Sequence, residues 1–205
     1  GSAMAPFYST LAIWVGAVVM AAMLKVTVAD STKKILFHPK EYQLYIGRIL
    51  LLIIIGFMQS ALICLGDLFF LGIQCKHPVM FVLTGMFTSF VYVNLIYALT
   101  VSFGDIGKAI AVVLMVMQVA GSGGTFPIQC APKFFQVVYP LLPFTHSMNA
   151  MRECIAGFYG TTYAAEIGKL AIYLVPSLLL GLLLRKPIIK MNDAFMEKLE
   201  STHLI

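Results

Sequence analysis

Residues 121–160, GSGGTFPIQCAPKFFQVVYPLLPFTHSMNAMRECIAGFYG, decide how this sequence folds. They interrupt a series of long apolar segments with glycines, prolines and an adjacent arginine and glutamate, Arg152 and Glu153. A simple helical membrane anchor has no need of such an interruption. The stretch therefore predicts a membrane domain with an internal structure of its own.

Composition places the whole chain in the membrane class. Of its 205 residues, 60% are hydrophobic and only 11% are charged, whereas about a quarter of the residues in soluble domains are charged. The net charge of +5 does not indicate nucleic acid, because the lysines and arginines lie at the ends of apolar runs, where topology places them. We predict an all-α membrane protein that contacts the lipid bilayer and no nucleic acid.

Five apolar segments are candidate spans, since a helix needs about 20 apolar residues to cross a bilayer. They cover residues 7–28, 45–65, 78–103, 106–121 and 167–189. The fourth is short, because residues 106–119 advance only about 20 Å as a helix. We predict a transmembrane domain over residues 1–190 and a tail over residues 191–205.

The distribution of basic residues predicts the orientation of these segments. If the first segment runs from outside to inside, ten lysines and arginines lie at cytoplasmic ends and four at outer ends. The opposite orientation would invert this positive-inside asymmetry. We therefore expect the N-terminus outside and the tail in the cytoplasm. Because the chain starts directly at a span and lacks the charged n-region of a signal peptide, we also expect it to be part of a longer protein.

The loop over residues 30–43, DSTKKILFHPKEYQ, is cytoplasmic in this orientation. Its basic residues and histidine can form a coupling loop that contacts a partner: Lys33, Lys34, His38 and Lys40. The simpler interpretation is a basic loop on anionic lipid headgroups, as is expected at any cytoplasmic membrane face.

The break after the fourth segment contains Gly123, Gly124 and Pro127, which end any regular helix there. Backbone without partners is too costly in hydrocarbon, so the break should be covered by protein or lie at the outer mouth of the bundle. A helix can then begin near Pro132 and run to residue 142, and Pro143 begins a second one. The sequence predicts two short re-entrant or interfacial helices over residues 131–160, on the outer side.

The second short helix carries an apolar stripe formed by Phe144, Met148, Met151, Ile155 and Phe158, at intervals of three and four residues. Polar residues are expected on its other side: Thr145, Asn149, Arg152 and Glu153. Gly157 or Gly160 can end the helix.

Few other polar residues are candidates for function. An arginine in a membrane segment is costly unless paired, so Arg152 has either a functional role or a structural one, joining the short helices to a span. Asn94 and Gln118 lie within predicted spans, where bonding between helices is a commoner role than substrate contact. The cysteines and histidines show no metal spacing, and no catalytic arrangement is visible. We predict no enzyme, cofactor or metal; Cys130 and Cys154 can form a disulfide or remain free thiols.

One family shares the pattern of the break: glycines before Thr125-Phe126-Pro127, then Pro132, Phe135-Gln136, Leu142-Pro143-Phe144-Thr145, Arg152 and Gly157. With these residues the chain resembles the C-terminal membrane region of the YhgE/Pip (phage infection protein) family, within the ABC-2-type permease superfamily. The resemblance implies six spans, the first of them upstream of a long extracellular domain, so that five of six are present here. It also implies two short re-entrant helices before the last span, on the outer side.

The resemblance also implies partners and a function. ABC-2-type permeases work as dimers with a cytoplasmic ATPase in the bacterial plasma membrane, and this chain has no GxxxxGK[ST] phosphate loop of its own. The implied function is a permease that exports hydrophobic or amphiphilic substrates. The alternative is a phage receptor, or a membrane protein associated with a type VII secretion machinery, without its own transport activity.

Overall fold

A computed structural model describes residues 2–23 and 41–183 of the chain, together with the isolated positions 190, 191, 194, 197 and 201. The described part is helical and contains no strand, so the prediction of an all-α protein is confirmed. Four of its helical segments are long and apolar enough to cross a membrane: Ala5–Met23, Tyr45–Phe69, Pro78–Phe103 and Thr162–Leu183. The chain is therefore a multi-pass membrane protein.

The helices follow the order of the predicted segments. They are α1 (Ala5–Met23), α2 (Glu41–Phe69), α3 (Pro78–Phe103), α4 (Asp105–Gly121), α5 (Lys133–Val138), α6 (Pro143–Ala156), α7 (Thr162–Ile172) and α8 (Leu174–Leu178), which continues as a π-helical turn over Leu179–Leu183. The predicted fourth segment forms α4, whose 17 residues are about 25 Å long. That each segment crosses a membrane, and where the domain ends, stay predictions.

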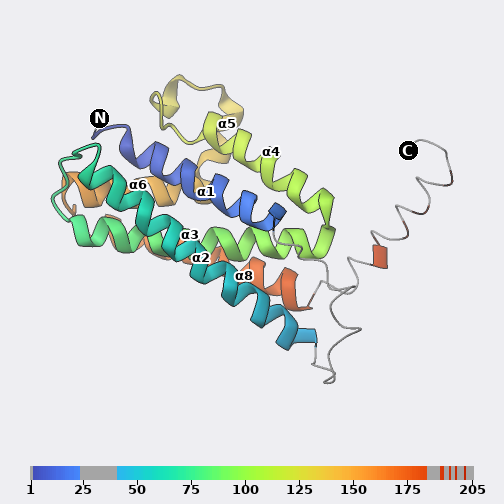
Figure 1. Cartoon of the computed structure of the whole chain (residues 1–205). Helices are drawn as coiled ribbons and strands as arrows, with labels where there is room; N and C mark the ends of the chain where they lie inside the picture. The colour runs from blue at the N-terminus through green and yellow to red at the C-terminus, as the bar shows by residue number, and fades with distance from the viewer. Residues whose placement is uncertain are drawn as a thin grey trace.

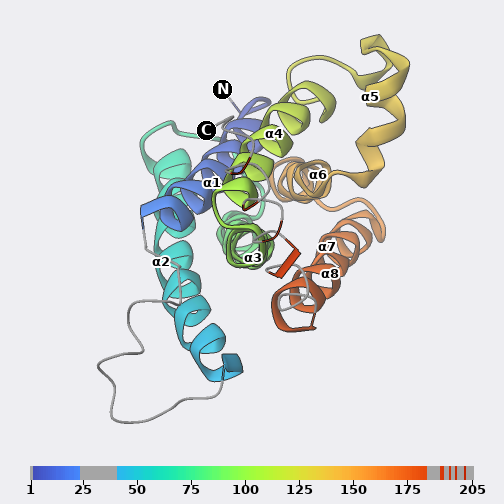
Figure 2. The same ribbon diagram turned by 90° about the vertical axis from the view of Figure 1, so that its right-hand side faces the viewer.

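Helix α3 lies at the centre of the bundle. In Figure 2, which looks nearly along α3, α1, α2, α4, α6 and the α7–α8 segment surround it. The aromatic core lies between α1 and α3, where the buried rings of Trp14 and Tyr92 meet edge to face at 4.8 Å. The indole N–H of Trp14 donates to the carbonyl of Ala111 at 3.2 Å, so the same core also joins α4.

Small residues let α2 approach α3 closely. A Cβ added at Gly85 would lie 2.4 Å from the sulfur of Cys64, and one added at Gly56 would lie 2.7 Å from the hydroxyl of Ser89. Such close backbone approach is typical of membrane helices, which gain van der Waals contact rather than hydrophobic burial when they associate. These contacts explain why a chain with few charges packs its helices in a defined register.

Helices α3 and α4 are joined by a tight turn at one end of the bundle (Figure 1). Gly104 adopts φ +60°, a conformation that favours glycine, and its N–H bonds to the carbonyl of Thr100 at 2.8 Å. Asp105 begins α4 directly afterwards and accepts a hydrogen bond from Lys108 at 3.1 Å. The turn lets α4 return antiparallel to α3.

The segment after α4 contains less regular helix than the sequence predicts. The first short helix was expected over residues 131–142, but α5 covers only Lys133–Val138 and a 3-10 turn follows over Tyr139–Leu141. Pro132 adopts φ −52° and ψ 149° and precedes the helix instead of forming its first turn. Pro140 lacks an N–H and disfavours helix at the preceding residue, so a regular helix cannot run on to residue 142.

Candidate functional site

The candidate site is the region where the break, α6 and the beginning of α7 meet. Helix α6 runs antiparallel to the first half of α3: the Tyr92 hydroxyl donates to Ser147 at 2.9 Å, and the N–H of His77 donates to the Cys154 carbonyl at 3.0 Å. Tyr92 lies about 21 Å along α3 from Pro78, which is about half of that helix. Helix α6 therefore begins at mid-height in the bundle and returns to the end at which α3 begins.

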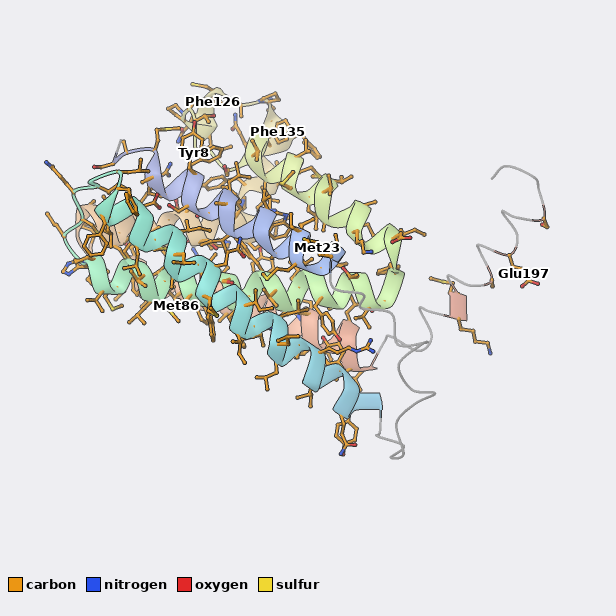
Figure 3. All side chains as sticks on the ribbon, in the orientation of Figure 1. Tyr8, Met23, Met86, Phe126, Phe135 and Glu197 are labelled. Carbon is orange, nitrogen blue, oxygen red and sulfur yellow. The ribbon has the colours of Figure 1, made fainter. Side chains whose placement is uncertain are left out.

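The surroundings of α6 differ from those of α5. Residues 142–148 are all buried, among α1, α3 and α7. Thr145 was expected on a polar face, but it is buried like Phe144 and Met148, because α6 is enclosed around its first two turns. Helix α5 instead exposes Phe134 and Val137. Figure 3 shows Phe126 and Phe135 on the segment that protrudes beyond the end of α4.

The glycines of the break permit close approach of this segment to α1. Gly123 adopts φ +65°, in the region that favours glycine. A Cβ added at Gly124 would lie 2.1 Å from Cδ2 of Phe7, whose ring packs against Phe144 of α6 at 5.7 Å. Pro127 immediately precedes the 3-10 turn Ile128–Cys130. The break is thus packed against the protein on one side.

Arg152 connects α6 to the break. Its guanidinium donates to the carbonyl of Gly123 at 3.3 Å and to the side-chain oxygen of Asn149 at 3.5 Å. Glu153 points elsewhere and accepts a bond from the N–H of Tyr159 at 2.8 Å. Arg152 and Glu153 form no ion pair in the part of the chain that the structure describes, because adjacent residues on a helix do not face each other.

Gln118 and Asn94 have different hydrogen-bond partners. Gln118 is fully buried near the end of α4, and its carbonyl oxygen accepts a bond at 3.1 Å from the N–H of Phe144, in the first turn of α6. Pro143 begins that helix, so Gln118 provides a partner for one of the first amides, which have none within the helix. Asn94 donates to the carbonyl of Phe90 on its own helix at 2.8 Å.

A buried hydrogen-bonded contact that the sequence did not predict joins α6 to α7. Nδ1 of His146 lies 2.6 Å from Oε2 of Glu166, and its Nε2 lies 3.0 Å from the carbonyl oxygen of Pro140. Lys169 contacts the other oxygen of Glu166 at 3.3 Å. Glu166 lies at the start of an apolar segment, and a carboxylate there is itself a signal of function. The sequence does not identify His146 as its partner, because the two residues are twenty positions apart.

The cysteines of the described segments are free thiols. Cys130 is exposed and Cys154 is buried, so the alternative of a disulfide between them does not occur here. The thiol of Cys75 instead donates to the carbonyl of Cys154 at 3.3 Å, and burial raises the pKa of this Cys75 thiol.

Two further predictions concern the coupling loop and a metal site. The proposed coupling-loop residues Lys33, Lys34, His38 and Lys40 lie outside the described residues. Among the residues that are described, no group of three histidine, cysteine or carboxylate side chains is arranged to hold a metal ion.

Comparison with known proteins gives one family and one relative. The family model described as "ABC-2 family transporter protein" matches residues 1–184. The "Uncharacterized protein YhgE" of Bacillus subtilis (strain 168) is 27% identical over 157 residues, which are 76% of this chain and 20% of that protein. The chain thus spans about a fifth of the length of this curated relative. No solved structure matches the chain.

Proposed function

This chain belongs to the ABC-2 family transporter proteins and is the membrane component of such a transporter, and we propose that it exports a hydrophobic or amphiphilic substrate from a bacterial cell. The observation that carries the proposal is the family match over residues 1–184, which includes the break and α6. The position of α6 supports the export proposal, because this helix begins at mid-height in the bundle. Irregular backbone at that depth is tolerated only where protein covers it or where it lines a water-filled path.

The energy for export comes from a separate subunit in this proposal. Members of the family typically partner with an ATPase, and the chain has no phosphate loop. We assign the contact with the ATPase to Lys33, Lys34, His38 and Lys40, on the cytoplasmic loop between the first two helices. The chain itself has no catalytic role, acts as a homodimer, and has its N-terminus outside and its C-terminus in the cytoplasm.

The proposal is tested by purifying the full-length protein from its native membrane and identifying what copurifies. We expect an ATPase whose hydrolysis is stimulated by the membrane component. Charge reversal of Lys33 and Lys34 should abolish the stimulation without lowering the amount of protein in the membrane. Reversal of Lys76 and Lys133, on the other side of the membrane in this orientation, is the matched control. Stimulation that survives the first change, or is lost equally with the second, contradicts the assigned contact.

One observation favours a second function. Four fifths of the length of the Bacillus subtilis relative lies outside the region that this chain matches, so a large additional part can carry the activity of such a protein. In that case the bundle anchors an extracellular domain used by phages or by a type VII secretion machinery. This second function would be favoured if deletion of the gene abolishes phage adsorption or secretion and if no ATPase copurifies with the protein.

A further inference from the structure

The last turn of α4 and the first turn of α6 carry three buried polar groups that the protein itself leaves without a partner. Gln118, Ser122 and Thr145 are 0%, 0% and 1% exposed. The side-chain nitrogen of Gln118 and the hydroxyls of Ser122 and Thr145 form no hydrogen bond with any residue that the structure describes. We propose that these three groups bind an internal water molecule at the start of α6.

The three groups face the same region between α4 and α6. The side-chain oxygen of Gln118 accepts a bond from the N–H of Phe144 at 3.1 Å, and Thr145 is the next residue of the chain. Ser122 follows Gln118 by four residues and has a helical backbone at the end of α4, so the two side chains lie on one face of that helix. All three groups therefore lie where α4 meets the start of α6.

The orientation of the Gln118 side chain is fixed by its partner on α6. The backbone N–H of Phe144 can only donate a hydrogen bond, so the oxygen of the Gln118 amide must face it. The NH2 group of Gln118 then carries two hydrogens and has no acceptor among the described residues. A buried donor without an acceptor is costly, and the positive end of the α6 dipole also favours an accepting oxygen there.

The hydroxyls of Ser122 and Thr145 differ from most buried hydroxyls of this bundle. Six of those donate to the carbonyl four residues earlier, which is the usual solution within a helix: Ser9, Ser60, Thr84, Thr100, Ser147 and Ser177. Ser122 and Thr145 do not form this bond. For Thr145 the corresponding carbonyl is that of Leu141, which lies outside α6 and accepts a bond from Tyr173. Both hydroxyls can therefore donate to an occupant or accept from it.

A water molecule matches these groups in chemistry and in size. It can accept from the Gln118 amide and bond to both hydroxyls, and internal waters typically make about three hydrogen bonds. Helix α4, which is described throughout, packs closely on α1 and α3 but not on α6, and Gly121 and Ser122 are small. A Cβ added at Gly121 would lie 3.0 Å from Phe135 and 3.3 Å from Leu142, so apolar side chains close this turn and the occupant must be small.

A polar face of α6 leads from the site to the end of the bundle at which α3 begins. Thr145, Asn149 and Arg152 follow one another at intervals of four and three residues on this face. Thr145 is buried, whereas Asn149 and Arg152 are partly exposed, so water can exchange along it. The bound water links α4 to α6 and lets α6 begin at mid-height with its polar groups satisfied. The inference requires neither an ATPase nor transport.

The sign of one substitution tests the bound water. Thr145→Val keeps the shape of the side chain and replaces the hydroxyl with a methyl group. If water is bound, the variant loses a hydrogen bond, and its unfolding equilibrium in an SDS titration of the full-length protein should shift toward the unfolded state by about fivefold or more. If the groups are dry, the variant loses a buried hydroxyl without a partner and should be as stable as the wild type or more stable. That result would overturn the proposal.

Thr88→Val is the matched control. The hydroxyl of Thr88 is also fully buried and without a partner among the described residues. Thr84 and Tyr92, one turn away on either side, contact Cys154 and Ser147, so Thr88 faces the side of α6 opposite to the proposed site. The control should therefore be neutral or stabilising. A loss of stability as large in the control as in the Thr145 variant would also overturn the proposal.

Two further measurements test whether one occupant is shared. Because the water bridges the two hydroxyls, Ser122→Ala and Thr145→Val should depart from additivity by about threefold or more in the unfolding equilibrium, and additive effects contradict the bridge. If the variants fail to fold, X-ray radiolysis of the wild-type protein decides the matter, since bound water then yields hydroxyl radicals beside buried side chains. Phe144 and Phe81 are both fully buried. We expect more oxidation at Phe144, and equal oxidation of the two rings would overturn the proposal.

Discussion

A methyl group at Gly124 should destabilise the junction between the break and α1. In Gly124→Ala the new Cβ would lie 2.1 Å from Cδ2 of Phe7 and 2.8 Å from its Cε2. The ring cannot easily move, since Phe7 is 3% exposed and packs edge to face against the fully buried Phe144. Overpacking of this kind costs about 1–3 kcal/mol, and we expect a loss of that size in the free energy of unfolding.

The assay is an SDS titration of the purified protein followed by the fluorescence of Trp14, the single tryptophan of the sequence. Trp14 is buried against Tyr92, so its emission reports the packing of α1 on α3. Gly66→Ala is the matched control, because a Cβ there meets nothing within 4 Å. A glycine in the interior of a helix costs about 0.5–1 kcal/mol relative to alanine, so the control should be neutral or stabilising.

A double-mutant cycle identifies the cause of the loss. Phe7→Ala removes the ring and by itself costs about 3–5 kcal/mol. In that background Gly124→Ala should cost only a few tenths of a kcal/mol, within about the error of additivity. If Gly124→Ala is as stable as Gly66→Ala, or if its cost remains without the ring of Phe7, the close approach of the break to α1 is refuted.

Three further substitutions or reagents test other contacts. Arg152→Ala should lower the free energy of unfolding by about 1–3 kcal/mol, because the partly buried carbonyl of Gly123 loses its charged donor. Lys133→Ala on the exposed surface should change it by less than about 0.5 kcal/mol, and equal effects would remove the special status of the arginine. Tyr92→Phe should cost about 1 kcal/mol through the lost hydroxyl bond, and an unchanged SDS midpoint would contradict that bond. Because partial burial raises the pKa of Cys75, maleimide should modify Cys75 more slowly than Cys130 near neutral pH and faster as the pH rises. Equal rates at neutral pH would contradict this partial burial.

The length and apolarity of the segments were enough to predict the helices of the bundle. Helix α3 covers the same residues as the predicted third segment. The length of the apolar run sets the extent of this helix and Gly104 ends it, and both signals are local in the sequence. Of the predicted stripe, Phe144, Met148 and Met151 are buried and Ile155 is partly buried, whereas Phe158 lies beyond the end of α6 and is 42% exposed. Gly157, with φ +109°, ends α6, as one of the two predicted glycines. These features depend on residues close together in the chain.

The errors arose where tertiary contacts decide the result. The prediction of a polar face at Thr145 is wrong, because α1, α3 and α7 enclose α6 and bury this residue. Arg152 and Glu153 are neighbours in sequence but point in different directions on α6, and their partners, Gly123, Asn149 and Tyr159, come from tertiary and local backbone contacts. The contact of His146 with Glu166 depends on how the α6–α7 connection folds back, which no local pattern encodes.

The side of the membrane that the break faces can be measured directly at Cys130. This thiol is exposed in the segment between α4 and α5. Intact cells that produce the full-length protein are treated with a membrane-impermeant maleimide, with Cys130→Ala as the control. We expect the label to enter at Cys130 without permeabilisation, and the variant to lose this share of the label and keep only the slower labelling of Cys75. Labelling of Cys130 only after the membrane is permeabilised would contradict the outer position of the break and the orientation of the whole bundle.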